Sequence, residues 1–427
     1  MRLVNIFITI ILSLSITLLA CPSWSGPLYP SFEGSEHIAL GNSVKLFFSK
    51  NDPGQSNYVM TMPNGLKLSY GDIVSFGDFY EIEDQPISQS SDPVERRRRF
   101  VKAFQSFAND LKAYNEATQI LALLHHEYQV ITDAINRGED PEKLYEKMAG
   151  DTNRQLNCIT GGGCEEGTWF LKPGRYLRLA NLDFDHFNDH ALLAYEAGHE
   201  VAIEQAITAH HNRNIKQLEM AYAMNALACH FLSDRFAAGH IRTPRLELFK
   251  GVSPNVTGSL LAGFMHREEN AYGVHVHNAE GTHWLAYGDR AFFTNKNLMN
   301  RIVLQQALQA SVNEIFAAYQ QGFVATHPVL DLIPYADEIN GNGNTDIAPL
   351  FFLDPKTKKL MRRVITANVY DYHWTTKWWG WSTLIQLSRE RGIPTEEQVL
   401  LLQSKEKEQA ILDGLILTKK LFSINVN

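Results

Sequence analysis

A long helical pattern with histidine and aspartate on its apolar face is the feature that most constrains the fold. The pattern runs from Ile215 to Ala238, and Gly239 is placed to end the helix. Four-residue spacing puts His230 and Asp234 on one face of this helix. The apolar residues of the same face are Leu227, Phe231 and Ala238. An ionised aspartate buried there is costly unless a cation or hydrogen bonds offset its charge. The helix therefore predicts either a bound metal ion or an Asp234 paired with Arg235 or another cation.

The residues after this helix extend the metal interpretation. If Gly239 ends the helix, the chain turns and His240 points back towards His230 and Asp234. The resulting His-x3-Asp-x5-His spacing is a candidate ligand set. The alternative is that both histidines are satisfied residues of the core.

A second cluster precedes the long helix. Its members are Asp183, Asp185, His186, Asp189 and His190. Helix capping alone accounts for Asp189, but not for His186. In the next helix His199 shares a stripe with Leu192 and Tyr195, which favours a core or supporting role over a ligand.

A third cluster follows His266. Glu269 lies one helical turn after this histidine, so an imidazole and a carboxylate face the same way, as a divalent metal requires. A charged helix end is the alternative, above all for Glu268. His275 and His277 alternate as in a strand and share a face, although an ordinary exposed strand explains them equally well.

The remaining patterns indicate a mainly α fold with a small N-terminal β element and a C-terminal region. Residues 58–61 and 66–70 flank a Pro-Asn-Gly turn, which predicts a β-hairpin. Helical spacing of Phe100, Phe104, Phe107, Leu111 and Tyr114 extends from Pro93 to about Gly138, and a further helix covers Asp189 to His211. The Asn-Gly stretch at 340–344 is the best boundary, so we expect a catalytic domain over 24–335 and a C-terminal region over 336–427.

The N-terminus predicts export. A positive charge at Arg2 and an apolar stretch over 6–20 are typical of a signal peptide, here assigned to 1–23. A lipoprotein cut at Cys21 is the alternative. We expect a secreted or cell-envelope protein, with delivery into a host cell left open.

Outside the cytoplasm disulfides persist, and Cys158 and Cys164, which flank three glycines, are the expected disulfide. Cys229, inside an apolar helix, is the expected buried thiol.

The net charge and the aromatic residues bear on whether the partner is nucleic acid or a membrane surface. The chain carries a formal net charge of −8, which argues against nucleic acid. Six aromatic residues crowd one C-terminal stretch: Tyr370, Tyr372, Trp374, Trp378, Trp379 and Trp381. They suit either a transient contact with a membrane surface or the core of the C-terminal region.

Taken in order, these motifs resemble the superfamily of zinc-dependent phospholipases C and P1-type nucleases. The resemblance rests on His186-Phe187, on Tyr195 and Gly198, on His230-x3-Asp234-x5-His240, and on His266 with an acid nearby. Four further blocks, at 65–73, 77–80, 265–270 and 284–289, look like a divergent family of bacterial secreted phospholipases C. The resemblance covers roughly residues 35 to 365.

The resemblance implies a cage for two or three zinc ions. Its implied ligands are His186, His230, Asp234, His240 and His266, completed by an acid that we assign to Glu269. The superfamily has its acid one position later, where this chain has Asn270. An upstream acid that bridges two zincs and assists the attacking water is assigned to Asp78, with Glu165 and Glu166 as alternatives.

The superfamily also begins its mature chain with a zinc-binding tryptophan, followed by a histidine ligand. Trp24 matches only if cleavage falls after Ser23, and His37 is the corresponding histidine.

The resemblance further implies the function. We expect a secreted phospholipase C that hydrolyses glycerophospholipids of the phosphatidylcholine type to diacylglycerol and a phosphorylated head group by zinc-activated water. Asp78 and Asp234 are the expected catalytic residues. One alternative is a zinc phosphodiesterase or nuclease of the same superfamily. The other is a non-catalytic exported protein that binds metal or lipid.

Overall fold

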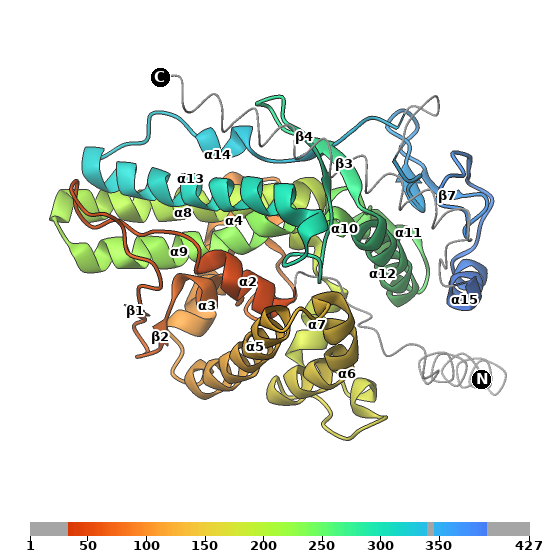
Figure 1. The fold of residues 1–427 in the computed structure, drawn as a ribbon, viewed down its shortest axis with the longest axis horizontal. Coiled ribbons are helices and arrows are strands. Elements are labelled where there is room, and N and C mark those ends of the chain that lie inside the picture. Colours follow the sequence, from red (N-terminus) through yellow and green to blue (C-terminus); the bar gives the residue numbers. More distant parts are fainter. Residues whose placement is uncertain (1–32, 340–345, 391–427) are drawn as a thin grey trace.

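The computed structural model describes residues 33–339 and 346–390, and over these the protein is mainly α-helical (Figure 1). The predicted signal peptide, with Cys21 and Trp24, and the boundary at 340–344 lie outside the described residues. Within those residues every helix is too short or too polar to cross a membrane.

Three long helices form the centre of the molecule: α8 (Asn188–Asn212), α9 (Ile215–Asp234) and α13 (Leu298–Gln321). They run side by side in Figure 1. Arg213, in the left-handed conformation, ends α8, and the Asn214 side chain caps the first amides of α9. Helix α9 is buried along most of its length, which explains how its polar residues come to lie inside the protein.

The end of α9 differs from the prediction. The helix stops at Asp234 rather than at Gly239, since the chain turns through 235–237 and then forms the short helix α10 (Ala238–Ile241). Gly239 therefore lies inside α10. His240 still returns towards α9, as expected, but a turn after Asp234 brings it there.

The predicted helix from Pro93 to Gly138 is two helices, α4 (Pro93–Ala108) and α5 (Ala113–Asn136). The break has a physical cause. Asn64, in the hairpin turn, donates from its side chain to the carbonyls of Phe107 and Asp110, and its backbone amide donates to the carbonyl of Ala108. These carbonyls therefore do not accept the backbone hydrogen bonds that would continue the helix. Leu111 lies in the break and is 76% exposed, contrary to its place on the predicted apolar stripe.

The N-terminal elements pack onto α9. They are α2 (Gly34–Gly41), the predicted hairpin of β1 (Met60–Thr61) and β2 (Lys67–Leu68), and α3 (Tyr70–Val74). The short helix η2 (Ile87–Gln89) contacts α8 and α4 instead. Helices α2 and α3 contact each other as well as α9. This arrangement brings residues 34–41 and the loop after α3 next to the end of α9.

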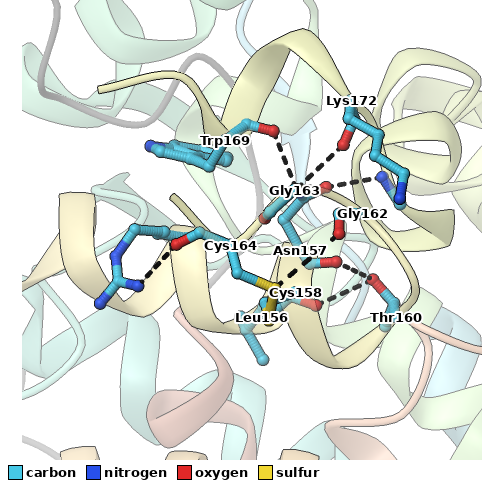
Figure 2. The surroundings of a disulfide bond; sticks show 11 residues. Leu156, Asn157, Cys158, Thr160, Gly162, Gly163, Cys164, Trp169 and Lys172 are labelled. Carbon is cyan, nitrogen blue, oxygen red and sulfur yellow. Dashed lines mark hydrogen bonds between the residues drawn. A yellow bond between two sulfur atoms is a disulfide. The ribbon is translucent and has the colours of Figure 1, made fainter. Parts of the chain in front are cut away.

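Helix α6 (Pro141–Ile159) leads into the expected disulfide between Cys158 and Cys164 (Figure 2). The Asn157 side chain organises this loop by donating to the carbonyls of Gly163, Trp169 and Lys172. The short helices η3 (Trp169–Leu171), α7 (Arg175–Asn181) and η4 (Phe184–His186) follow. Cys229 is a buried free thiol, also as expected.

The second half of the chain adds α11 (Arg245–Gly251), α12 (Asn255–Tyr272) and an antiparallel sheet in the order β4-β3-β5. Its strands are β3 (Val274–His277), β4 (His283–Ala286) and β5 (Tyr335–Ala336). The short helices η5 (Asn295–Asn297) and α14 (Pro328–Asp331) flank α13.

The described part of the C-terminal region packs against α11 and α12. It contains β6 (Phe351–Leu353), β7 (Leu360–Arg363), β8 (Trp374–Thr375) and α15 (Gly380–Glu390). Trp378 and Trp381 contact a core shared with Leu248 and Met265, whereas Trp379 is 65% exposed. Part of the aromatic cluster therefore belongs to the hydrophobic core.

Candidate metal centre

Two neighbouring helix turns supply the middle of the site. His230 and Asp234 lie one turn apart at the end of α9, and both are fully buried. The Nε2 atom of His230 is 3.3 Å from Oδ2 of Asp234. His37 of α2 comes within 3.7 Å of the other Asp234 oxygen. These three residues form one group whose donor atoms could hold a metal ion.

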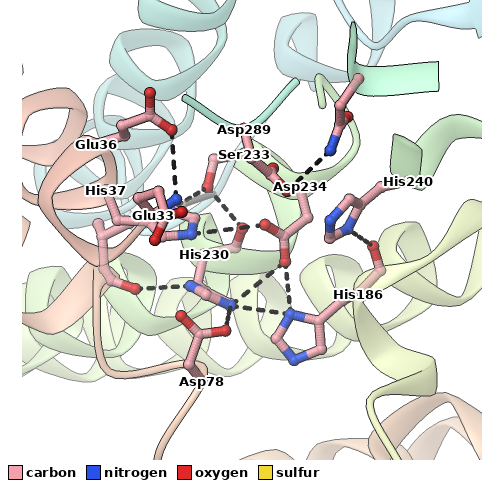
Figure 3. A network of polar contacts seen from close by, with 12 residues as sticks. Glu33, Glu36, His37, Asp78, His186, His230, Ser233, Asp234, His240 and Asp289 are labelled. Carbon is pink, nitrogen blue, oxygen red and sulfur yellow. Dashed lines mark hydrogen bonds and ion pairs between the residues drawn. The ribbon is translucent and has the colours of Figure 1, made fainter. Parts of the chain in front are cut away.

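His186 and Asp78 complete a second group around the same histidine (Figure 3). The Nδ1 atom of His186 is 3.1 Å from Nε2 of His230 and 2.7 Å from Oδ2 of Asp234. Asp78, from the loop after α3, places Oδ1 3.7 Å from Nε2 of His230. Glu165 and Glu166, the alternatives to Asp78, are exposed beside the disulfide instead.

The acidic cluster around His186 has a supporting role. Asp185 accepts hydrogen bonds from the backbone amides of Ile87 and Ser88, and Asp183 pairs with Arg245. These contacts fix η4 and hence the position of His186. On the far side of the ring, Oε1 of Glu81 lies 2.7 Å from Nε2, a partner that the sequence analysis did not identify. A carboxylate behind a ligand histidine orients the ring and raises its basicity.

A third group contains His240, His266 and Asp289. His240 comes from α10 and His266 from α12, and their ring centroids are 4.8 Å apart. Asp289 follows β4 and places Oδ2 3.1 Å from Nε2 of His266. The site therefore gathers seven of the eight predicted ligands and adds Asp289.

Glu269 is the predicted ligand that the structure does not bring into these groups. Its Oε1 atom pairs with Nε of Arg242 at 2.6 Å, so this side chain turns away from His266 to bind a buried guanidinium. Asn270 lies at the site instead. It donates to Oδ2 of Asp289 at 2.8 Å and accepts from the amide of Gly239. The carboxylate expected near position 270 is thus supplied by Asp289, held in place by Asn270.

The hydrogen bonds of the histidines leave ring nitrogens free to bind a cation. His230 Nδ1 is 2.9 Å from the carbonyl of Val74, and His240 Nδ1 is 2.7 Å from the carbonyl of His186. A carbonyl accepts, so both Nδ1 atoms carry the proton and both Nε2 atoms present a lone pair. Nε2 of His240 and Oδ1 of Asp289 are buried without a hydrogen-bond partner.

Burial sets the protonation of these groups. It lowers the pKa values of His230, His240 and His266 well below the ordinary histidine value, which keeps the rings neutral. It raises the pKa of Asp234 to about 6, and that of Asp289 well above its usual range. The raised pKa values mean that the ionised forms of these carboxyls lack a compensating positive charge. A divalent cation would supply the missing charge, so the residues fit a metal site.

His186 behaves differently from the other rings. Burial alone would lower its pKa, but the carboxylates of Glu81 and Asp234 outweigh that effect and raise the pKa well above its ordinary value.

Two glycines allow the ligands to approach the backbone. A Cβ atom at Gly77 would lie 2.0 Å from Cδ2 of His230, and one at Gly239 would lie 2.5 Å from Cδ2 of His266. Both distances are far below van der Waals contact.

The third group opens to a cleft of about 390 Å³. His266, Asn270 and Asp289 contribute to its lining, together with Glu142, Lys143, Glu146 and Asn153 of α6. Charged side chains of both signs line the cleft: Lys143, Arg267, Arg290 and Lys296, with Glu33, Asp140, Glu142, Glu146 and Asp289. The cleft provides access from solvent to otherwise buried ligands.

Comparisons of the chain with protein-family models, with curated proteins and with solved structures found no match.

Proposed function

We propose that the protein is a zinc-dependent phospholipase C that hydrolyses the phosphodiester bond of a glycerophospholipid. The observation that carries the proposal is the convergence of buried imidazoles and carboxylates in three groups, of which the third reaches a cleft through His266 and Asp289. Five histidines and three aspartates take part: His37, Asp78, His186, His230, Asp234, His240, His266 and Asp289. Mixed nitrogen and carboxylate ligands are those that zinc takes in hydrolases.

Two of the three groups share His230, and the third has donors of its own, which together favour more than one ion. His230 belongs to two groups, and Asp234 has one oxygen near His37 and the other near His186. A carboxylate with its oxygens directed to different groups is suited to bridging two cations. Zinc, when bound, activates water as a nucleophile near neutral pH and offsets charge on phosphoryl oxygens.

The chain's own residues position the other participants. Asp78 is 12% exposed at its side chain, whereas Asp234 is fully buried, so Asp78 is better placed to accept a proton from water. Arg267 and Arg290 line the cleft beside His266 and Asp289, where a guanidinium would donate hydrogen bonds to a bound phosphodiester, although Arg290 also pairs with Glu33. These observations support a role for Asp234 in holding metal and a role for Asp78 in proton transfer.

The C-terminal region supports a lipid substrate. Residues 346–390 contain seven Lys and Arg against four Asp and Glu, although the whole chain is acidic. Val364, Ile365 and Trp379 of the same region are exposed. Basic and exposed apolar side chains together favour transient binding to an anionic membrane surface. The disulfide supports export, since such bonds persist in oxidising compartments.

The test combines metal removal with two substrates. The purified chain is depleted of metal, reconstituted with zinc, and assayed for release of phosphorylated head group from phosphatidylcholine vesicles and for cleavage of single-stranded DNA. We expect head-group release that requires zinc. Asp234→Asn removes the activity, while the exposed His373→Ala retains it. Cleavage of DNA without release of head group would support a nuclease in place of a phospholipase C. Full hydrolysis in a verified metal-free sample would refute the zinc mechanism.

A further inference from the structure

A separate group of metal-binding side chains lies on the outer face of the β4-β3-β5 sheet. His277 of β3 is directly opposite His283 of β4 and Tyr335 of β5. Residues paired across antiparallel strands share a face, and so do residues two apart along one strand. Asp337, two residues after Tyr335, therefore lies on the same face as both histidines.

The three side chains converge on one carboxylate oxygen. Oδ1 of Asp337 is 2.7 Å from Nδ1 of His277 and 3.8 Å from Nδ1 of His283. The donor atoms of the three residues all lie within 4.8 Å of one another. The exposed fractions are 41% for His277, 67% for His283 and 33% for Asp337, so an ion can enter from solvent.

A similar group elsewhere in the protein is already saturated with hydrogen bonds. His199 Nε2 and His327 Nδ1 both bind Oε2 of Glu314, at 2.9 and 2.8 Å. The remaining nitrogen of His199 lies close to the side chains of Asn225 and Ser311. This His199 group forms a complete network without a metal. In the sheet group His277 is hydrogen-bonded to Asp337, but His283 is 3.8 Å from this carboxylate, beyond hydrogen-bond distance.

We propose that His277, His283 and Asp337 form a second site for a divalent cation of the zinc class. Two imidazoles and one carboxylate are ligands that zinc accepts, and three protein ligands leave a position for water. The proposal does not rest on the catalytic function, because none of its residues belongs to the three groups of the metal centre.

The position of the sheet site in the sequence connects it to the metal centre. Strand β3 directly follows α12, which carries His266, and β4 leads directly to Asp289. A cation on the sheet ties β4 and β3 to the segment after β5. It therefore holds the hairpin that connects two ligands of the metal centre.

The test is the number of zinc ions bound by the full chain, measured by elemental analysis after equilibrium dialysis against a buffered zinc concentration. His283→Ala and Asp337→Asn each test the site. Exposed His373, which pairs with Asp371, supplies one control as His373→Ala. His327→Ala, in the His199 group, supplies the other.

We expect His283→Ala and Asp337→Asn to bind one zinc ion fewer than the wild type, and both controls to bind the wild-type number. Cobalt-loaded samples provide a second readout, since the site variants should lose part of the visible absorption. Equal zinc content in wild type, His283→Ala and Asp337→Asn would overturn the proposal. Loss of an ion in His327→Ala, with none lost in His283→Ala, would also overturn it.

Discussion

Replacing Gly77 with alanine tests the geometry of the metal centre through a single methyl group. The added Cβ atom would lie 2.0 Å from Cδ2 and 2.1 Å from Cγ of His230, whereas ordinary contact begins at 3.4 Å. His230 is fixed by its bond to the Val74 carbonyl and lies between the rings of His37 and His186. The ring or the loop must therefore move by about 1 Å or more, an amount comparable to the displacements that disable positioned groups.

This movement is large compared with the tolerance of a zinc ligand. Ligand distances vary by only about 0.2 Å from their usual values, so a shift of about 1 Å removes His230 from coordination. Overpacking of a core costs about 1–3 kcal/mol, which a protein of ordinary stability survives. We therefore expect Gly77→Ala to fold but to bind fewer zinc ions and to lose hydrolytic activity.

The assay is zinc content per chain together with circular dichroism and the midpoint of thermal unfolding. Gly251→Ala is the matched control, because a Cβ atom there meets its nearest neighbour at 3.7 Å. We expect Gly251→Ala to keep the zinc content of the wild type. If Gly77→Ala folds and binds zinc with wild-type stoichiometry and affinity, the ligand role of His230 is refuted.

Three further predictions follow from particular side chains. Asp289→Asn should lose zinc from the group that contains His240 and His266. Glu269→Gln should keep this zinc, because Glu269 binds Arg242. Zinc analysis that shows the opposite order would contradict the assignment. Burial raises the pKa of Glu127 to about 8, so its ionised form destabilises the fold and its contribution to stability falls as the pH rises from about 4.5 to about 8. Glu127→Gln removes this dependence, and denaturant titrations should show its stability relative to the wild type increasing over that range; a constant difference would count against it. Replacing Cys158 and Cys164 with serine should cost about 2 kcal/mol, as expected for a short loop, and leave zinc content unchanged; a loss of zinc would show that the loop shapes the centre.

Local periodicity predicted much of the fold and of the centre. His230 and Asp234 were placed together by helical spacing, and the hairpin at 58–70 by its turn residues. The break between α4 and α5 was not predicted, because Asn64, more than forty residues away, takes the helix carbonyls. The local spacing of residues carries no information on partners so distant in the sequence.

The same limit explains the two differences at the centre. Glu269 has the right spacing from His266, but its direction is decided by Arg242, which only the fold brings near. Asp289 reaches His266 through the β3–β4 hairpin, so no short motif connects them. Its position after the glycine of the block at 284–289 was the only signal in the sequence.

Anomalous diffraction from a crystal of the zinc-loaded chain, measured on both sides of the zinc absorption edge, tests the central claim most directly. We predict peaks at the three groups that contain His37, His186 and His240, including one in contact with Asp234. Zinc-specific density that is absent from these groups, in a crystal of catalytically active protein, would contradict the account.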